Sequence, residues 1–424
     1  MLILFVYVAI FVLAFLVVRF GTSKALQASG FNALKTVTFG DESAVTPNRA
    51  ASVVSVLTLF FLWGAFTGSS LLPSFLHAPG PFMGDTSFTY TARDANGNTD
   101  DATVFARVHV VGEEVEEPVA TGPDEGFAKN DVMTAGAWRS ELIRVDRNDE
   151  LGRKDGVEIV AVNGQPITPG ARVKIADGEV GMTPKGTLNL IPAKGLQMEP
   201  IWLPAPEAVF KRFLNVASEG YQNSNLWEHL GYSLYRVVLG FFFGALVGIP
   251  LGYAMGLSGW FRGWFDPIVE FMRPVPPLAL IPLVIIWAGI GESGKIILLF
   301  LAALWIMTIA ARAGVSGVNI TKVHAAYSLG ASKRQILHHV IIPNSLPEIF
   351  TGARVAMGVC WGTVVAAELV AAEVGAGMMI MVASRFQLTD IVIMGIILIG
   401  IIGYGIDILF RQAEKYLVPW KGRS

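Results

Sequence analysis

The sequence predicts an all-α polytopic membrane protein that carries a β-rich insert, and three observations support this. Only 16% of the 424 residues are charged, whereas soluble domains usually carry about 25%. Several apolar runs reach the roughly 20 residues that a helix needs to cross the hydrocarbon core of a bilayer. Between two of these runs, residues 73–200 contain β-like stretches, of which residues 87–92 alternate between polar and apolar side chains in the way that is typical of a strand.

The charge distribution separates this block from the rest of the chain. Residues 73–200 hold 20 acidic and 12 basic residues, a net charge of −8, while the remainder has a net charge of +6. An acidic block inside a basic, apolar chain indicates a domain boundary and gives no support to nucleic-acid binding. The single cysteine, Cys360, excludes an internal disulfide.

Seven segments are expected to span the membrane. The first, Leu2 to Val18, suits a signal peptide or an anchor helix. No basic residue precedes it and no clear small-residue cleavage site follows, which favours an anchor over residues 1–20. A linker over 21–50 and a first core helix over 51–72 follow. The other spans are expected near 232–255, 267–288, 295–312, 347–372 and 390–410.

The placement of lysine and arginine predicts the orientation of these spans, because cytoplasmic loops are enriched in both. Three basic groups would all be cytoplasmic if the N-terminus is outside, and the block at 73–200 would then also lie outside. The groups are Arg19, Lys24, Lys35 and Arg49; Arg312, Lys322, Lys333 and Arg334; and Arg411, Lys415, Lys421 and Arg423.

One predicted span carries glycine at every fourth position. A four-residue spacing places these glycines on one helix face, where they allow another helix to approach closely in lipid. We expect a packing seam between helices or subunits. The glycines are Gly240, Gly244, Gly248, Gly252 and Gly256.

Residues 321–350 form a basic, amphipathic segment that the orientation places in the cytoplasm. A helical pattern breaks at Gly330, which suits the positive φ of a helix C-terminus. The pattern restarts at Ser332, a good N-cap, and is expected to stop at Pro343. The prediction is a short helix, a tight turn and a second helix that leads back to the membrane.

This segment resembles the coupling loop of permease subunits in ATP-binding-cassette importers. The resemblance rests on the run from Ala325 to Ser332 followed by Pro343 and Pro347, although His324 stands near the position of the usual glutamate. Three further runs resemble the taurine, alkanesulfonate and nitrate branch, and taurine permeases most of all. They are Arg273–Ala279, Ile290–Glu292 and Val364–Leu369.

The resemblance implies a MetI-like permease core over 201–424, with a coupling loop over 321–347, in a bacterial inner membrane. It implies a homodimer, two cytoplasmic ATPase subunits that hold ATP and magnesium, and a periplasmic binding protein. It also implies taurine as the solute, with nitrate, bicarbonate or an aromatic sulfonate as alternatives. The residues that would contact the ATPase are Ala325, Ala326, Ser328, Leu329, Gly330, Ala331, Ser332 and Pro343.

No cofactor or metal is expected on this chain, and no enzymatic activity. Residues 289–295 nearly match a phosphate-binding loop, but Ile296 stands where the motif needs serine or threonine for magnesium. The run also joins two expected spans instead of opening a soluble βαβ unit. The ATPase is therefore expected to be a separate chain.

Charged residues inside spans usually face an interior or a pore. We predict that Glu270, Arg273, Trp361 and Glu368 lie along a solute pathway. Arg273 and Glu368 suit a solute that carries a sulfonate and an ammonium group, but a structural ion pair between helices explains them equally well. Arg354 is expected to reach toward the cytoplasmic interface.

The insert is expected to be one β-sandwich-like domain in the periplasm. Residues 87–92 and 103–111 suit two strands around an Asn96-Gly97 turn, and a second β-rich stretch follows over about 130–192. These pieces resemble bacterial immunoglobulin-like or cadherin-like adhesin repeats in swapped order. This order favours a circularly permuted domain whose ends lie side by side.

The function of the insert stays open at this point. Its acidic residues would serve solubility or bind calcium, although they lack a compact ligand spacing. A membrane-anchored adhesion or sensor protein is the alternative from another functional class, and it would need no coupling loop.

Overall fold

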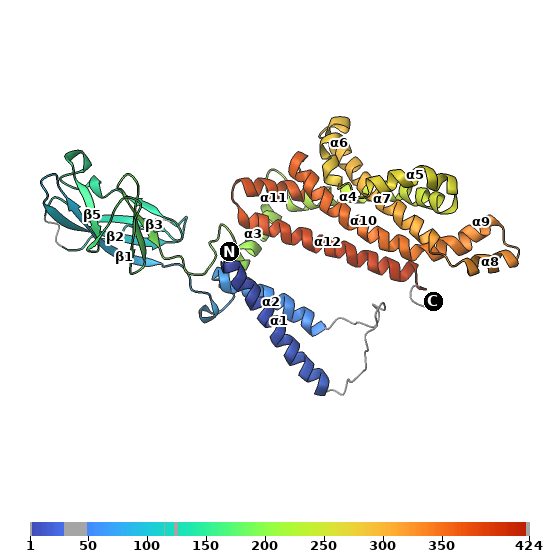
Figure 1. The fold of residues 1–424 in the computed structure, drawn as a ribbon, viewed down its shortest axis with the longest axis horizontal. Helices are drawn as coiled ribbons and strands as arrows, with labels where there is room; N and C mark the ends of the chain where they lie inside the picture. Colours follow the sequence, from blue (N-terminus) through green and yellow to red (C-terminus); the bar gives the residue numbers. More distant parts are fainter. Residues whose placement is uncertain (1, 29–48, 114, 123–125, 421–424) are drawn as a thin grey trace. The chain divides into compact units, whose positions relative to one another are not determined.

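The computed structural model describes residues 2–28, 49–113, 115–122 and 126–420. The chain divides into two compact units, Met1–Glu207 and Ala208–Ser424 (Figure 1). The first unit holds two apolar helices and all nine described strands, and the second is helical. The apolar helical regions and the β-rich region that the sequence predicts are therefore both present.

The first unit begins with helices α1 (Leu2–Ala28) and α2 (Arg49–Thr67). Ile10 and Phe11 of α1 pack against a small cluster on α2 around Leu62 and Phe66. The α1 helix extends beyond the expected anchor boundary at residue 20. The α2 helix ends earlier than expected because Gly68 adopts a φ of +64°, which ends a helix. Most of the linker expected over 21–50 lies outside the described residues.

The strands of the first unit form two sheets that share one core. The first sheet has the order β3-β2-β1-β5-β6, and the second has the order β4-β9-β8-β7. All pairs are antiparallel except β2 with β3. Tyr90 and Val104 of the first sheet join Val180 and Leu188 in one buried cluster.

The alternating burial along β1 and β2 follows from this arrangement, because one face of each strand points into the core. The strands are β1 (Gly84–Arg93), β2 (Thr99–His109), β3 (Asp131–Gly136), β4 (Glu141–Ile143), β5 (Glu158–Val162), β6 (Gln165–Pro166), β7 (Arg172–Ile175), β8 (Gly178–Met182) and β9 (Leu188–Pro192). Three short 3₁₀ helices accompany them: η2 (Ser74–Leu76), η3 (Val145–Arg147) and η4 (Arg153–Asp155).

Two turns of the insert contain an asparagine-glycine pair, and the sequence predicted the one at Asn96-Gly97. Asn163 and Gly164 both have positive φ, 46° and 72°, and join β5 to β6. The turn at Asn96-Gly97 is longer than two residues. It closes between Asp94 and Asn98, and the Asp94 carboxylate accepts hydrogen bonds from the backbone of Asn96 and Asn98, both at 2.8 Å.

The two ends of the β-rich block lie side by side, as the sequence predicted. The Phe82 backbone donates to the Ala193 carbonyl at 2.9 Å, and the Leu196 backbone donates to Pro79 at 2.7 Å. The returning chain is then bound near the end of α2, where the Trp63 indole donates to the Pro204 carbonyl at 2.8 Å. These contacts let a folded block leave and re-enter the chain at one place.

The second unit contains four helices that are long and apolar enough to cross a membrane: α4, α7, α10 and α12. They correspond to the predicted spans at 232–255, 295–312, 347–372 and 390–410. The helices are α3 (Pro206–Glu219), α4 (Leu226–Leu257), α5 (Gly259–Met272), α6 (Ile281–Ala288), α7 (Glu292–Ser316), α8 (Ile320–Ser328), α9 (Lys333–Ile336), α10 (Ile342–Ala371), α11 (Ala376–Arg385) and α12 (Thr389–Leu417), with η5 (Pro277–Leu280) between α5 and α6 and a π segment, η6 (Leu337–Ile341), between α9 and α10.

The predicted span at 267–288 is not one straight helix. The helix α5 and the segment formed by η5 and α6 meet at a bend of 92°. Pro274, Pro276 and Pro277 follow directly on Arg273 and cannot donate backbone hydrogen bonds, so the helix stops there. The pair is a broken span or a re-entrant loop.

The glycines of α4 lie against α7. A Cβ atom added at Gly248 would stand 2.7 Å from the Leu304 carbonyl oxygen, and one at Gly256 would stand 2.8 Å from the Val315 side chain. The remaining glycines of the repeat, Gly240, Gly244 and Gly252, meet α7 in the same way. Four-residue spacing on one helix therefore brings two helix backbones together within this chain.

Candidate functional site

The α8–α9 pair at one end of the second unit is built around the Gly330 turn (Figure 1). Gly330 has a φ of +82°. The Gly330 backbone donates to the Tyr327 carbonyl at 2.9 Å, and the Ala331 backbone donates to the Ala326 carbonyl at 3.1 Å. This is the Schellman pattern of a helix C-terminus, and it confirms the helix end that the sequence predicted.

The second helix of the pair begins as predicted but does not stop where predicted. Ser332 caps α9 reciprocally with Gln335. Pro343 then lies in the first turn of α10 instead of ending a helix. At the end of the preceding π segment, the Ile342 backbone N–H donates a hydrogen bond to the Leu337 carbonyl. This wider turn accommodates a proline, which has no N–H to donate.

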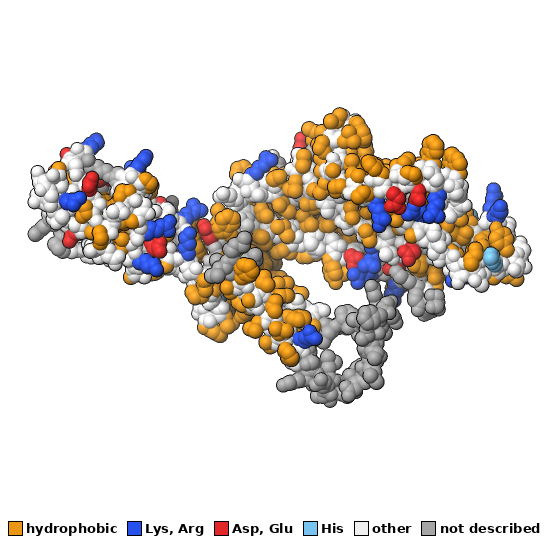
Figure 2. Space-filling model, in the orientation of Figure 1, with side chains coloured by type: hydrophobic (Ala, Val, Ile, Leu, Met, Phe, Trp, Pro, Cys, Tyr) orange, Lys and Arg blue, Asp and Glu red, His pale blue; other side chains and the backbone are white. Residues whose placement is uncertain are grey.

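The surface of this pair combines exposed apolar, small and basic side chains. The Leu329 side chain is 89% exposed and the Tyr327 side chain is 49% exposed. Ala325 and Gly330 are exposed beside them, and Figure 2 shows a histidine and a basic (lysine or arginine) side chain on the surface at this end of the unit. Small residues beside a protruding leucine allow a partner to approach the backbone closely, as in hydrophobic contacts between proteins.

A second feature of this unit is a buried ion network around Arg236, a residue of α4. The Arg236 guanidinium donates to Glu368 of α10 at 2.5 Å and to both carboxylate oxygens of Glu292 on α7 at 2.6 Å. Lys295 adds a contact to Glu292 at 2.9 Å. The Arg236 and Glu368 side chains are almost completely buried, so the network binds three long helices together.

The Glu368 carboxylate is also surrounded by hydrogen-bond donors. Ser233 donates to it at 2.8 Å, and the Gly377 backbone donates at 2.9 Å. Ser233 itself accepts from the Ala376 backbone at 2.9 Å, and His229 accepts from the Gly375 backbone at 3.1 Å. The start of α11 is thereby fixed to α4, and Glu368 has the partners that a buried carboxylate requires.

The structure separates the four residues of the predicted pathway. Glu368 pairs with Arg236, while Arg273 lies near Glu270 at 3.7 Å in an exposed pair. Glu270 also accepts from Arg312 of α7 at 3.0 Å. Trp361 is buried in the α4–α7–α10 core, and its indole donates to the Ile399 carbonyl at 3.0 Å. Arg273 and Glu368 therefore have different ionic partners in the described residues, and the predicted solute pathway stays a prediction.

Sequence reasoning missed Arg236 and Glu292, although a signal was present. Arg236 is a charged residue inside the predicted span at 232–255, the same criterion that selected Glu368. Arg354, expected to reach toward the interface, instead donates to Asp407 of α12 at 3.0 Å. Asp407 was likewise a charge within a predicted span.

The near match to a phosphate-binding loop connects α6 to α7. Gly289 ends α6 with a φ of +75°, Gly291 caps α7, and Lys295 is turned to Glu292. Across the described residues, no group of three or more histidine, cysteine or acidic side chains is placed to hold a metal ion.

Comparisons with known proteins agree on one kind of protein. Residues 244–417 match a family model described as binding-protein-dependent transport system inner membrane component. The chain is 47% identical over 226 residues to the taurine transport system permease protein TauC of Escherichia coli K12, a match that covers 53% of this chain and 82% of that protein. It is 38% identical over 218 residues to the putative aliphatic sulfonates transport permease protein SsuC of Escherichia coli K12 (51% and 81%). It is 32% identical over 222 residues to the nitrate import permease protein NrtB of Synechocystis (51% and 81%).

Proposed function

Because this chain belongs to the inner-membrane permease subunits of binding-protein-dependent ATP-binding-cassette importers, we propose that it carries a small organosulfonate such as taurine into the cell. Its relatives are transporter components of the taurine, sulfonate and nitrate branch. Such permeases work with ATPase and substrate-binding partners.

The exposed helix pair α8–α9 is the observation that carries the coupling proposal. Each of two permease copies presents its α8–α9 pair to one ATPase subunit. When ATP binds, the two ATPase subunits close together and displace the helix pairs. The turn at Gly330 is rigid, because Schellman and capping bonds satisfy its backbone. The π segment continues into α10 without a flexible loop. Displacement of the pair is thereby transmitted to α10 and its buried partners, and the pore alternates between inward-facing and outward-facing states.

The taurine proposal draws support from the 47% identity to TauC. Of the four predicted pathway residues, Arg273 is the cation that stays exposed, at 65% of its side chain. It lies at the bend between α5 and η5, and irregular backbone at membrane depth is tolerated where it lines a cavity. We propose that Arg273 attracts the sulfonate group on its way through the pore.

The orientation of the insert follows from the positive-inside rule and is likewise a proposal. The basic Arg312 lies near the end of α7, ahead of the α8–α9 pair, and Lys333 begins α9. The rule assigns such basic residues to the cytoplasmic side, and the β-rich block then lies in the periplasm. Its two sheets and single core support a β-sandwich. Its paired ends support insertion of a complete domain between two spans.

Uptake by the reconstituted importer tests this function. The full chain is placed in liposomes with its cognate ATPase and binding protein, and ATP-dependent uptake of taurine, an alkanesulfonate and nitrate is measured separately. Taurine uptake that requires all three components supports the proposal. Uptake of nitrate alone would assign nitrate as the solute in place of taurine, and transport without the ATPase would contradict the coupling.

A further inference from the structure

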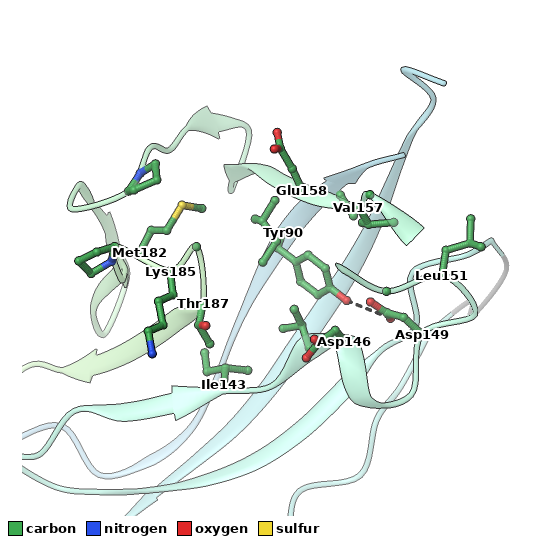
Figure 3. Close-up of a pocket in the computed structure, with 18 residues that line it drawn as sticks. Tyr90, Ile143, Asp146, Asp149, Leu151, Val157, Glu158, Met182, Lys185 and Thr187 are labelled. Atoms are coloured by element: carbon green, nitrogen blue, oxygen red, sulfur yellow. Dashed lines mark hydrogen bonds between the residues drawn. The ribbon is translucent and has the colours of Figure 1, made fainter. Parts of the chain in front are cut away.

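The β-rich unit contains a cavity that transport does not explain. It has a volume of about 510 Å³, within the range of roughly 300–1,000 Å³ that small-molecule sites occupy. Both sheets line it: Tyr90 comes from β1, Ile143 from β4 and Met182 from β8 (Figure 3). The cavity is therefore an opening in the core between the sheets.

The lining of the cavity is apolar on its floor and predominantly acidic at its edge. Tyr90 is completely buried, and Ile143 and Met182 are also buried. The charged lining residues are Asp146, Asp149 and Glu158 against the single Lys185, a net charge of −2. Such a lining suits a molecule with an apolar body and a positive charge.

Two of the three carboxylates are placed to receive that charge. Glu158 lies 3.8 Å from Arg93 in an exposed pair, which leaves Asp146 and Asp149. The Asp149 carboxylate accepts from the Lys129 backbone at 2.7 Å and from the Tyr90 hydroxyl at 3.4 Å, so its position beside the aromatic ring is fixed (Figure 3). Partial burial raises the pKa of the Asp149 carboxyl, and a bound cation would offset this cost.

We propose that this cavity binds a small organic ammonium compound with an apolar body. The ammonium group lies between the Asp146 and Asp149 carboxylates, where it forms charge-assisted hydrogen bonds. The apolar body packs against the exposed Leu151 and the partly exposed Ile159 of the lining, with Met182 at the floor, and an aromatic or aliphatic chain fits a lining of this kind. The site lies within the β-rich unit, and the proposal does not depend on the chain being a transporter.

The probe for this site is 2-phenylethylammonium, and 3-phenylpropionate is its matched control of opposite charge. Both are titrated into the full-length chain in nanodiscs by calorimetry. Methionine methyl groups labelled with ¹³C report the place of binding, because Met182 lines the cavity. The Met182→Leu variant identifies its resonance.

The expected result is saturable binding of the ammonium compound with a shift of the Met182 methyl resonance. Asp149→Asn keeps the oxygen that accepts from Lys129 and Tyr90 and should weaken binding about tenfold. Asp146→Asn should weaken binding in the same direction, and its exposed position leaves folding intact. Glu179→Gln removes an equal charge from β8 outside the cavity and should change nothing.

Four outcomes would overturn the proposal. Equal affinity for 3-phenylpropionate would show that charge does not select the ligand. Unchanged affinity in both aspartate variants would remove the cation site. Binding of the ammonium compound without a shift of the Met182 resonance would exclude the cavity as its location. No binding at millimolar concentration would mean that the chain has no such site.

Discussion

Arg236 and Glu368 form an ion pair inside the helical unit, with 2.5 Å between Arg236 Nη1 and Glu368 Oε1, and at most 1% of either side chain is exposed. The residues are 132 positions apart and lie on α4 and α10. A charge pair that is shielded from both water and lipid holds its partners more tightly than an exposed pair. The pair therefore ties α4 to α10 where α7 and α11 also meet.

Removing one partner of this pair should be much more destabilising than removing both. Glu368→Leu leaves the buried Arg236 charge with Glu292 as its remaining ion-pair partner, and breaking a buried pair costs about 3–5 kcal/mol. The double variant with Arg236→Met should recover part of that loss. Unfolding of the full chain in detergent, followed by tryptophan fluorescence, measures each change.

A partly exposed pair on the same helix provides the control. Arg354→Gln breaks the contact between Arg354 and Asp407, whose side chains are each about one-third exposed, and should cost no more than about 1 kcal/mol. A double variant at Arg236 and Glu368 that is less stable than both single variants would contradict this account.

The glycine face of α4 gives a second prediction. A Cβ at Gly248 would stand 2.7 Å from the Leu304 carbonyl oxygen and 3.1 Å from the Met307 Cβ. Gly248→Ala should therefore separate α4 from α7 and cost about 1–3 kcal/mol. The same detergent unfolding experiment measures it.

Gly231 is the matched control because it lies on the same helix with nothing within 4 Å of an added Cβ. Gly231→Ala should leave stability unchanged or raise it by up to about 1 kcal/mol, since alanine is the better helix former. Equal effects of the two substitutions would mean that close helix contact is not the reason for the glycine repeat.

Local signals in the sequence predicted the helices and turns of this protein better than the long-range pairing of its side chains. Gly330 indicates a turn and Ser332 indicates a helix N-cap, because the backbone within a few residues determines both. The pairing of Glu368 depends on which helix faces α10, and sequence distance does not reveal this. Arg236 was visible as a charge within a span, but its partner required the three-dimensional structure.

The same limit explains the two errors in helix boundaries. Pro343 usually marks a helix end, but the π segment before it supplies a turn that proline can follow. The prolines after Arg273 were recognised as helix breakers, yet the apolar run across them still suggested one span. Short apolar runs do not distinguish a straight span from two bent halves.

The Asp149 carboxyl that lines the cavity should make the local stability of the β-rich unit depend on pH. Burial raises the folded-state pKa of Asp149 above its usual 3.8. The stabilisation that the protonated Asp149 contributes is therefore fully present below pH 3.8, and it is lost as the pH rises through the folded-state pKa. Hydrogen exchange of the β1 and β5 segments in the full chain, corrected for intrinsic rates, should show less protection across that range.

Asp149→Asn removes this titration and should flatten the pH dependence. Asp94 is the opposite case, because hydrogen bonds from Asn98 and Asn96 lower its pKa, so Asp94→Asn should leave the change near β5 intact. An unaltered pH profile in Asp149→Asn would assign the effect to another group.

The Gly330 turn provides the sharpest test of coupling between the helix pair and an ATPase. Asparagine and aspartate both tolerate the positive φ at this position, and nothing lies within 4 Å of an added Cβ. Both variants should therefore fold and reach the membrane. They differ by one charge, and an unpaired carboxylate costs far more than an amide when a partner covers it. Gly330→Asp should accordingly abolish ATP-dependent uptake, while Gly330→Asn retains a large part of it. Solute-stimulated ATP hydrolysis, measured on the same proteoliposomes, should fall in parallel with uptake. Normal uptake by the aspartate variant at equal membrane levels would mean that no partner covers this turn, and the coupling proposal would then fail.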